Sequence, residues 1–203
     1  HYTAAGIIPK AIDYWEEAGK QAVRTSANRE AIDRLQRGLQ LVKDLPPSAE
    51  RDQRELSLTI YLGLAMMAAR GYGALETAET YRRAYELCRE CGSTAHLPPA
   101  LTGLAISSFL RGELHETYDL GLRMATMAGE GEAQLELASH VLLGVSSTYI
   151  RHLSVAQEHL ELARKTYDPR CTAQYLAAYG QDPGVIATSY LALDLLARNR
   201  VED

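Results

Sequence analysis

The sequence predicts an all-α fold in which antiparallel helix pairs stack into a right-handed α-α superhelix, or solenoid. Three observations predict it. Apolar residues recur at spacings of three and four, glycine and proline fall between these apolar segments, and the junctions between helices return about every 40 residues. We therefore expect residues 1–203 to form a single repeat domain of about four helix pairs and a final helix.

The predicted helices follow the apolar periodicity along the chain. They cover residues 9–24, 27–44, 49–70, 74–91, 97–111, 113–128, 132–151, 154–166 and 183–198. Ser48 and Ser154 suit helix N-termini, and Gly71, Gly92 and Gly112 suit the left-handed position that ends a helix. Because the loops are only about two to six residues long, consecutive helices are expected to pack as antiparallel neighbours.

A trio of side chains recurs in the second helix of the predicted pairs. A small residue is followed four positions later by a large one, and three positions after that by another small one: Ala31, Leu35, Gly38; Thr77, Tyr81, Ala84; Ala156, Leu160, Ala163; with a degraded form at Thr117, Gly121, Met124. The first helix carries the same trio at Ala11, Trp15 and Ala18. Small residues admit a neighbouring helix while the large one fills its groove. This is the packing of tetratricopeptide repeats, so we expect a tetratricopeptide-like array with a longer period than usual.

Composition and charge exclude several classes of protein. The net charge of -5, with no basic stripe, argues against a nucleic-acid partner. The longest apolar stretch, Leu62 to Ala69, is too short to cross a bilayer, so no membrane insertion is expected. Three cysteines and no glycosylation sequon favour a cytoplasmic location.

No arrangement of residue types predicts catalysis, a metal or a cofactor. Cys88 and Cys91 have Cys-x-x-Cys spacing, but a second metal-binding half is absent, and packing within a helix explains both thiols better. The histidines form no metal motif; they are His1, His96, His115, His140, His152 and His159. Ser146 and Ser147 lack a nucleophile elbow. We therefore expect no catalytic residues.

The concave face of the predicted array, formed by the first helix of each pair, is the expected binding surface. The candidates that line it by position are Ile60, Leu64, Met67, Val141, Val145, Thr148 and Tyr149. The surface they form is expected to be apolar, which suits a peptide or protein segment.

A long insertion from 167 to 182 precedes the last helix. Asp182 suits its N-cap and Pro183 its first turn, followed by Gly184. Capping does not explain Tyr179 and Gln181, which we expect to shape a ligand groove where the insertion folds onto the repeats. The sequence leaves open whether this block binds anything or only caps a helix.

Six segments occur in an informative order. They are His1-Tyr2-Thr3 with Ala5-Gly6; Ala11 to Trp15 with Ala18-Gly19; Ser26-Ala27-Asn28 with Glu30 to Ile32; Tyr81 with Arg83-Ala84 and Leu87-Cys88; Arg111 to Leu114; and Tyr179 to Val185. Together they resemble the C-terminal helical-repeat region of bacterial signalling proteins that join a class III adenylate or guanylate cyclase domain and a STAND-type ATPase to tetratricopeptide-like repeats. The resemblance implies a sensor arm that regulates an upstream ATPase or cyclase.

The sequence thus predicts a non-catalytic scaffold for protein interaction or sensing, and the start at His1 suggests a fragment of a longer protein. The expected partner is a protein or peptide, such as another domain of the same chain, and a homodimer is also compatible. Two alternatives stay open: a small-molecule-binding regulatory domain, which needs an enclosed cavity, and a structural dimerisation arm, which needs a self-complementary apolar patch.

Overall fold

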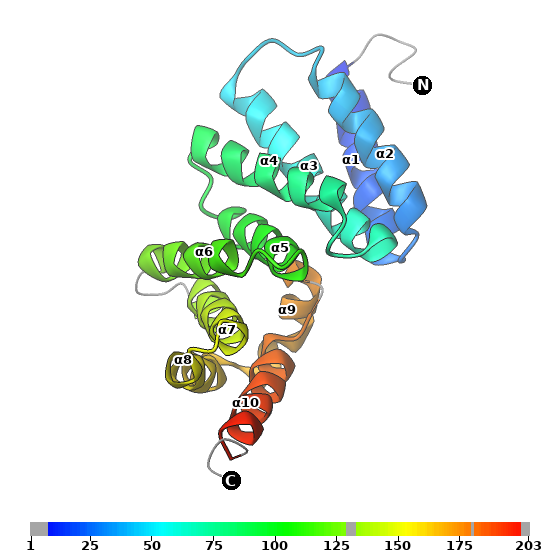
Figure 1. The fold of residues 1–203 in the computed structure, drawn as a ribbon. Coiled ribbons are helices and arrows are strands. Elements are labelled where there is room, and N and C mark those ends of the chain that lie inside the picture. Colours follow the sequence, from blue (N-terminus) through cyan, green and yellow to red (C-terminus); the bar gives the residue numbers. More distant parts are fainter. Residues whose placement is uncertain (1–7, 129–132, 180, 200–203) are drawn as a thin grey trace. The chain divides into compact units, whose positions relative to one another are not determined.

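A computed structural model describes residues 8–128, 133–179 and 181–199 of the chain (Figure 1). Within these ranges all regular structure is helical and no strand occurs, which confirms the all-α prediction. The helices are α1 (Ile8–Arg24), α2 (Asn28–Val42), α3 (Ala49–Arg70), α4 (Leu75–Cys91), α5 (Leu97–Leu110), α6 (Leu114–Met127), α7 (Ala133–Tyr149), α8 (Leu153–Thr166), a 3-10 turn (Pro169–Cys171), α9 (Thr172–Tyr179) and α10 (Pro183–Asn199). None of the described helices has the length and apolar character needed to span a bilayer.

The predicted helix boundaries agree with the observed ones to within two residues. The sequence predicted no helix at α9, because its eight residues are too few for an apolar periodicity to show. The segment from His1 to Gly6 and Gly180, both part of the resemblance above, lie outside the described residues.

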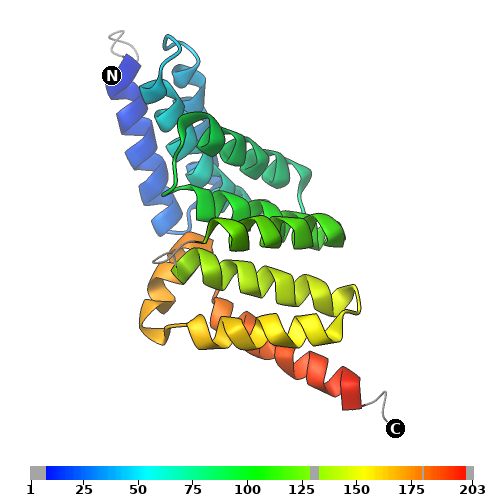
Figure 2. The ribbon, with the colours of Figure 1, turned by 90° about the vertical axis from the view of Figure 1, so that its left-hand side faces the viewer.

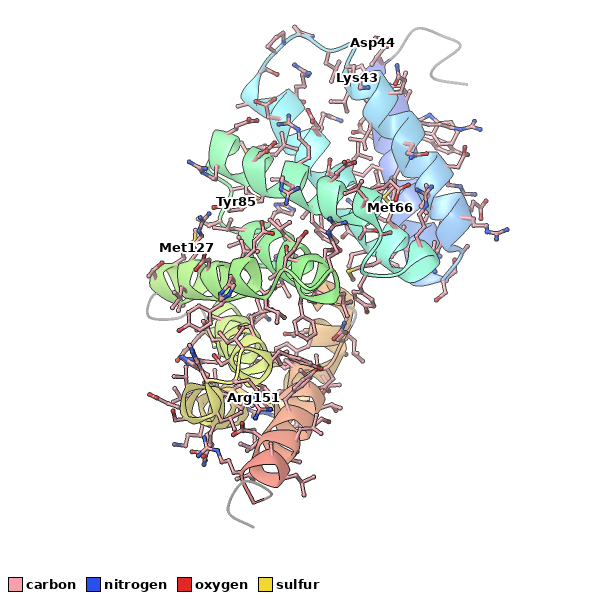
Figure 3. The ribbon with its side chains drawn as sticks, in the orientation of Figure 1. Lys43, Asp44, Met66, Tyr85, Met127 and Arg151 are labelled. Carbon is pink, nitrogen blue, oxygen red and sulfur yellow. The ribbon has the colours of Figure 1, made fainter. Side chains whose placement is uncertain are left out.

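The structure confirms the predicted caps at Ser48 and Gly92, but not those at Gly71 and Ser154. Gly71 follows α3 with φ 86° and ψ 163°, which is not the left-handed helical conformation, whereas Gly112, after α5, has a positive φ of 79°. The Ser48 hydroxyl accepts a hydrogen bond from the amide of Arg51 at the start of α3, and Gly92 ends α4 in the left-handed conformation, with φ 64° and ψ 26°. The prediction for Ser154 is wrong. Arg151 turns the chain with φ 67° (Figure 3), so α8 already begins at Leu153 and Ser154 lies inside its first turn.

The chain divides into two compact units, residues 1–104 and 105–203. In the first unit α2 packs along α1 and α3, and α4 packs along α3. One hydrophobic cluster joins α1, α2 and α3 through Ile12, Leu35 and Leu58. A second joins α3, α4 and the start of α5 through residues such as Leu56 and Leu87. The single repeat domain stays a prediction.

In the second unit α7 packs along α6 and α8, and α10 packs against both α7 and α8 (Figure 2). Its hydrophobic cluster includes Leu137 of α7, Leu160 of α8 and Leu191 of α10. The short helix α9 contributes Tyr175 to the same cluster. Consecutive helices therefore pack as pairs in this unit as in the first.

The large residue of each trio packs against a glycine of a neighbouring helix. A β-carbon added at Gly63 of α3 would lie 2.7 Å from Cζ of Tyr81, and one added at Gly144 of α7 would lie 2.5 Å from Cγ of Leu160. Both large residues are fully buried. The glycines thus allow the helices to approach closely enough for the large side chain to fill the space between them.

The degraded trio in α6 has a structural explanation. Gly121 stands at the position of the large residue, and Leu143 of the next helix packs against it, with Cγ 2.9 Å from where a β-carbon would lie. The large and small partners have exchanged helices, so the contact is kept although the pattern in α6 is lost. The trio of α1 differs too: Ala11 is buried, but Trp15 and Ala18 are only partly so.

Candidate functional site

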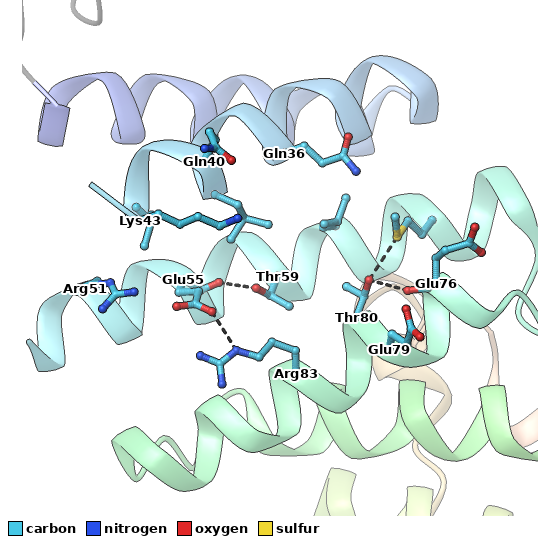
Figure 4. A pocket seen from close by; sticks show the side chains of 14 residues that line it. Gln36, Gln40, Lys43, Arg51, Glu55, Thr59, Glu76, Glu79, Thr80 and Arg83 are labelled. Carbon is cyan, nitrogen blue, oxygen red and sulfur yellow. Dashed lines mark hydrogen bonds and ion pairs between the residues drawn. The ribbon is translucent and has the colours of Figure 1, made fainter. Parts of the chain in front are cut away.

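An open groove with a volume of about 640 Å³ runs over α3 in the first unit, between α2 and α4 (Figure 4). Its lining residues come from these three helices and from Lys43, which directly follows α2; they are Gln36, Leu39, Gln40, Val42, Lys43, Arg51, Glu55, Thr59, Leu62, Met66, Glu76, Glu79, Thr80 and Arg83. Among the described helices α1 packs against α3, but no comparable packing joins α2 to α4. The side chains of α2 and α4 therefore stay apart and form the walls.

The floor of the groove is apolar and belongs to the core. Val42, Leu62 and Met66 are buried members of the cluster that joins α1, α2 and α3, and Leu39 packs against it. Because core side chains are close-packed, the shape of this floor is held by the fold.

The two ends of the groove carry opposite charge. Lys43, directly after α2, and Arg51, in the first turn of α3, lie at one end (Figures 3 and 4), while Glu76 and Glu79 of α4 lie at the other. Neither Lys43 nor Arg51 forms an ion pair with a described residue, and Nε of Arg51 is buried without a hydrogen-bond partner. The positive end of the groove thus offers hydrogen-bond donors that no described residue accepts from.

An ion pair closes the middle of the groove. Nε of Arg83 donates to Oε1 of Glu55 at 2.9 Å, and the carboxylates of Glu86 and Glu90 lie 3.8 and 3.4 Å from the same guanidinium. Burial lowers the pKa of Arg83, but the bond to Glu55 and the surrounding carboxylates outweigh it, so the net change is upward. Arg83 and Glu55 are therefore already satisfied, unlike the cations at the end.

The two hydroxyls that line the groove, those of Thr59 and Thr80, donate to main-chain carbonyl oxygens of their own helices. Thr59 donates to the carbonyl oxygen of Glu55 at 2.7 Å. The Thr80 hydroxyl lies 2.7 Å from the carbonyl oxygen of Glu76 and 3.3 Å from Sδ of Met66. Both hydroxyls thus already have acceptors within the protein.

None of the residues predicted to form a concave surface lines this groove. In α3, Ile60 and Met67 are buried and Leu64 is half-buried. At 3.6 residues per turn these three positions lie on nearly the opposite side of α3 from Arg51, Glu55, Thr59, Leu62 and Met66. The side of α3 that lines the groove is thus nearly opposite the side that the sequence predicts to bind a partner.

The remaining concave-surface candidates lie on α7. Val141 and Val145 are buried, Thr148 is half-buried, and Tyr149 is 52% exposed. The Tyr149 ring packs edge-on against Phe109, with ring centroids 5.1 Å apart, and its hydroxyl lies 3.4 Å from that of Tyr190. Burial, together with this bond, raises the pKa of Tyr190 to about 12. Partner binding by this face stays a prediction.

The segment before α10 is organised by Asp182. Its Oδ1 accepts hydrogen bonds from the amides of Gly184 at 2.8 Å and Val185 at 3.2 Å, which is the predicted cap, with Pro183 as the first helical residue. Its Oδ2 accepts from the Tyr167 hydroxyl at 3.0 Å. A hollow of about 400 Å³ beside it is lined by Arg164, Tyr167, Gly184, Val185, Thr188 and Ser189.

Neither Tyr179 nor Gln181 is among the residues that line this hollow. Gln181 is half-buried, and the side chain of Tyr179, at the end of α9, lies outside the described residues. Their role in a ligand groove stays a prediction.

The three cysteines are free thiols. Cys88 is buried in the core, as its helical position predicts, and burial raises its pKa to about 12. Sγ of Cys91 donates to the carbonyl oxygen of Leu87 at 2.9 Å. Cys88 is therefore a thiol and not a thiolate at neutral pH.

Comparison with known families and proteins adds no assignment: no family model matches the chain, and no curated protein sequence matches it.

Proposed function

We propose that the chain is a non-catalytic interaction scaffold whose groove over α3 binds an extended segment of a partner protein. The observation that carries this proposal is the polarity of the groove. Two cations without an ion pair to a described residue lie at one end. Glu79 and Glu76 lie at the other, with Glu76 3.6 Å from Arg70, and an apolar floor lies between the ends. Such a surface fits a segment with acidic residues at one end, apolar residues in the middle and basic residues at the other end.

The length of the groove sets the length of the segment. Along α3 its lining residues run from Arg51 to Met66, which at 1.5 Å per residue is about 22 Å. An extended chain rises about 3.3 Å per residue, so about six or seven residues fill the groove. Main-chain groups of that segment would meet the amide side chains of Gln36 and Gln40, which stand on the α2 wall.

The openness of the groove favours a protein segment over a small molecule, because small-molecule sites bury most of their ligand in an enclosed cavity. The wider context belongs to the same proposal. Stacking of the helix pairs into a right-handed tetratricopeptide-like superhelix, and regulation of an upstream ATPase or nucleotide cyclase in a bacterial signalling protein, are supported by the repeat pattern and the sequence resemblance respectively.

A pair of peptides tests the proposal. One labelled seven-residue peptide carries two glutamates, three leucines and two lysines in that order; the other has the same composition with the charges alternating. We expect the full chain to bind the first peptide more tightly by fluorescence anisotropy, and binding to weaken with salt. Equal binding of both peptides, or none, contradicts a polarised groove.

Charge reversal locates the site. Lys43→Glu and Arg51→Glu remove the unpaired cations, and each is expected to weaken binding of the first peptide about tenfold, which corresponds to about 1.4 kcal/mol. Lys165→Glu reverses an exposed lysine on α8 and serves as the matched control. Equal losses in all three variants would show a non-specific charge effect and contradict the proposed location.

A further inference from the structure

Two histidines from neighbouring helices meet in the second unit. His140 of α7 and His159 of α8 place their Nδ1 atoms 3.0 Å apart. Their ring centroids are 5.2 Å apart and the ring planes differ by 29°. Both side chains are half-buried, and α7 and α8 pack along one another, so the fold holds the two imidazoles together.

This separation is the one that a metal ion requires of two adjacent ligands. Metal–imidazole bonds are about 2.0–2.1 Å long, so two nitrogens at 90° to 110° around one ion lie about 2.9–3.4 Å apart. The Nδ1 atoms therefore already stand at chelating distance. In the metal-free chain one ring donates its Nδ1 proton to the Nδ1 lone pair of the other. Metal binding requires the donating ring to take the tautomer protonated on Nε2, its Nδ1 proton being exchanged through solvent, so that both Nδ1 lone pairs face the ion.

The groups around the pair favour a cation. Nε2 of His140 lies 3.9 Å from Oε1 of Glu136, one turn earlier on α7. A carboxylate on that side favours the tautomer with its proton on Nε2, which leaves the lone pair on Nδ1. Glu158, next to His159, acts electrostatically on both rings. Two carboxylates thus accompany the two neutral ligands.

We propose that His140 and His159 form a binding site for a divalent late first-row transition metal, with water completing its coordination. Imidazole ligands suit Zn²⁺, Ni²⁺ and Cu²⁺, and Cu²⁺ binds such ligands most tightly. Among the described residues no third histidine, cysteine or carboxylate joins the pair as a ligand. The site therefore takes an exchangeable ion, and it is independent of the groove in the first unit.

Isothermal titration of the full chain with NiCl₂ or ZnCl₂ at pH 7.5, in a buffer that does not chelate metals, tests the site. We expect the unmodified chain to bind one equivalent of metal. His140→Gln and His159→Gln should each lower the affinity for this equivalent at least tenfold. Glu136→Gln removes the positioning carboxylate and is expected to weaken binding about tenfold. His115→Gln and His152→Gln change exposed histidines outside the pair and should leave this equivalent intact.

A second measurement needs no variant at the site. Cu²⁺ is paramagnetic, so its binding to the unmodified chain is expected to broaden the amide signals around residues 140 and 159 first in an NMR titration. The proposal is overturned if the unmodified chain binds no equivalent of metal, or if His140→Gln and His159→Gln bind it as tightly as the unmodified chain. It is also overturned if the broadening centres elsewhere in the chain.

Discussion

The ring of Tyr81 in α4 occupies space that exists only because residue 103 in α5 is glycine. A β-carbon added at Gly103 would stand 2.3 Å from Cε1 of that ring, and one at Gly63 in α3 would stand 2.7 Å from Cζ. Tyr81 is only 1% exposed, so its ring has nowhere to move. One large side chain is thus enclosed by glycines from two other helices.

Gly103→Ala is therefore expected to destabilise the protein. Overpacking of a close-packed core costs about 1–3 kcal/mol, which exceeds the gain of up to about 1 kcal/mol from replacing a mid-helix glycine by alanine. Urea unfolding followed by circular dichroism measures the change. A double-mutant cycle with Tyr81→Leu should show that the cost of Gly103→Ala falls when the ring is absent; additive losses would contradict the contact.

Asp182→Ala removes the cap of α10 and the acceptor of the Tyr167 hydroxyl. Loss of an N-cap costs about 0.5–2 kcal/mol, and thermal unfolding measures it. Asp182→Asn keeps an oxygen that can accept from the Gly184 and Val185 amides, so most of the stability should remain. If alanine and asparagine are equally destabilising, the cap is not the cause.

The three cysteines are expected to react with iodoacetamide at different rates. Burial raises the pKa of Cys88 to about 12, so very little of its thiol is ionised at pH 8, whereas Cys91 and Cys171 are partly exposed. Mass spectrometry of the labelled chain should show Cys88 modified last. In denaturant the three thiols should react alike, and a Cys88 that reacts first in the folded chain would contradict its burial.

His96 is expected to make stability depend on pH. Burial lowers its pKa below the ordinary 6.5, with the charge of Lys20 acting in the same direction and Glu16 against it. The unfolded chain then binds more protons than the folded one, so the stabilisation present above about pH 6.5 is lost as the pH falls. Urea unfolding at pH 7.5 and 5.5 should show a smaller fall in His96→Gln than in the unmodified chain; an equal fall would contradict the assignment.

The helices and the binding surface differ in how far the sequence predicts them. The apolar periodicity predicts the bounds of the described helices other than α9 to within two residues. It can do so because the spacing of buried apolar and exposed polar residues is a property of each helix by itself. The groove is different. The sequence places a binding face on the side of α3 that carries Ile60 and Met67, but these residues are buried, and the open side of α3 lies opposite them.

The histidine pair and the groove, neither of which we predicted, both correspond to patterns in the sequence. His140 and His159 stand at similar distances from the turn at Arg151, so an antiparallel pairing of the two predicted helices would have brought them together. The groove left a weaker signal, since Arg51, Glu55 and Thr59 follow one side of α3 while Leu62 and Met66 continue it. A polar side that turns apolar does not by itself reveal whether a neighbouring helix covers it.

By itself the sequence determined the all-α class, the bounds of the long helices, the caps at Ser48 and Asp182, and the residues that fill the space between paired helices. These features depend on interactions within one helix or between consecutive ones. Only the tertiary structure decided that α2 and α4 stay apart over α3, that Leu143 replaces the missing large residue of α6, and that two imidazoles meet across α7 and α8. Each of these depends on how helix axes pack and rotate against one another, which is set by the combined fit of many side chains and not by any local pattern.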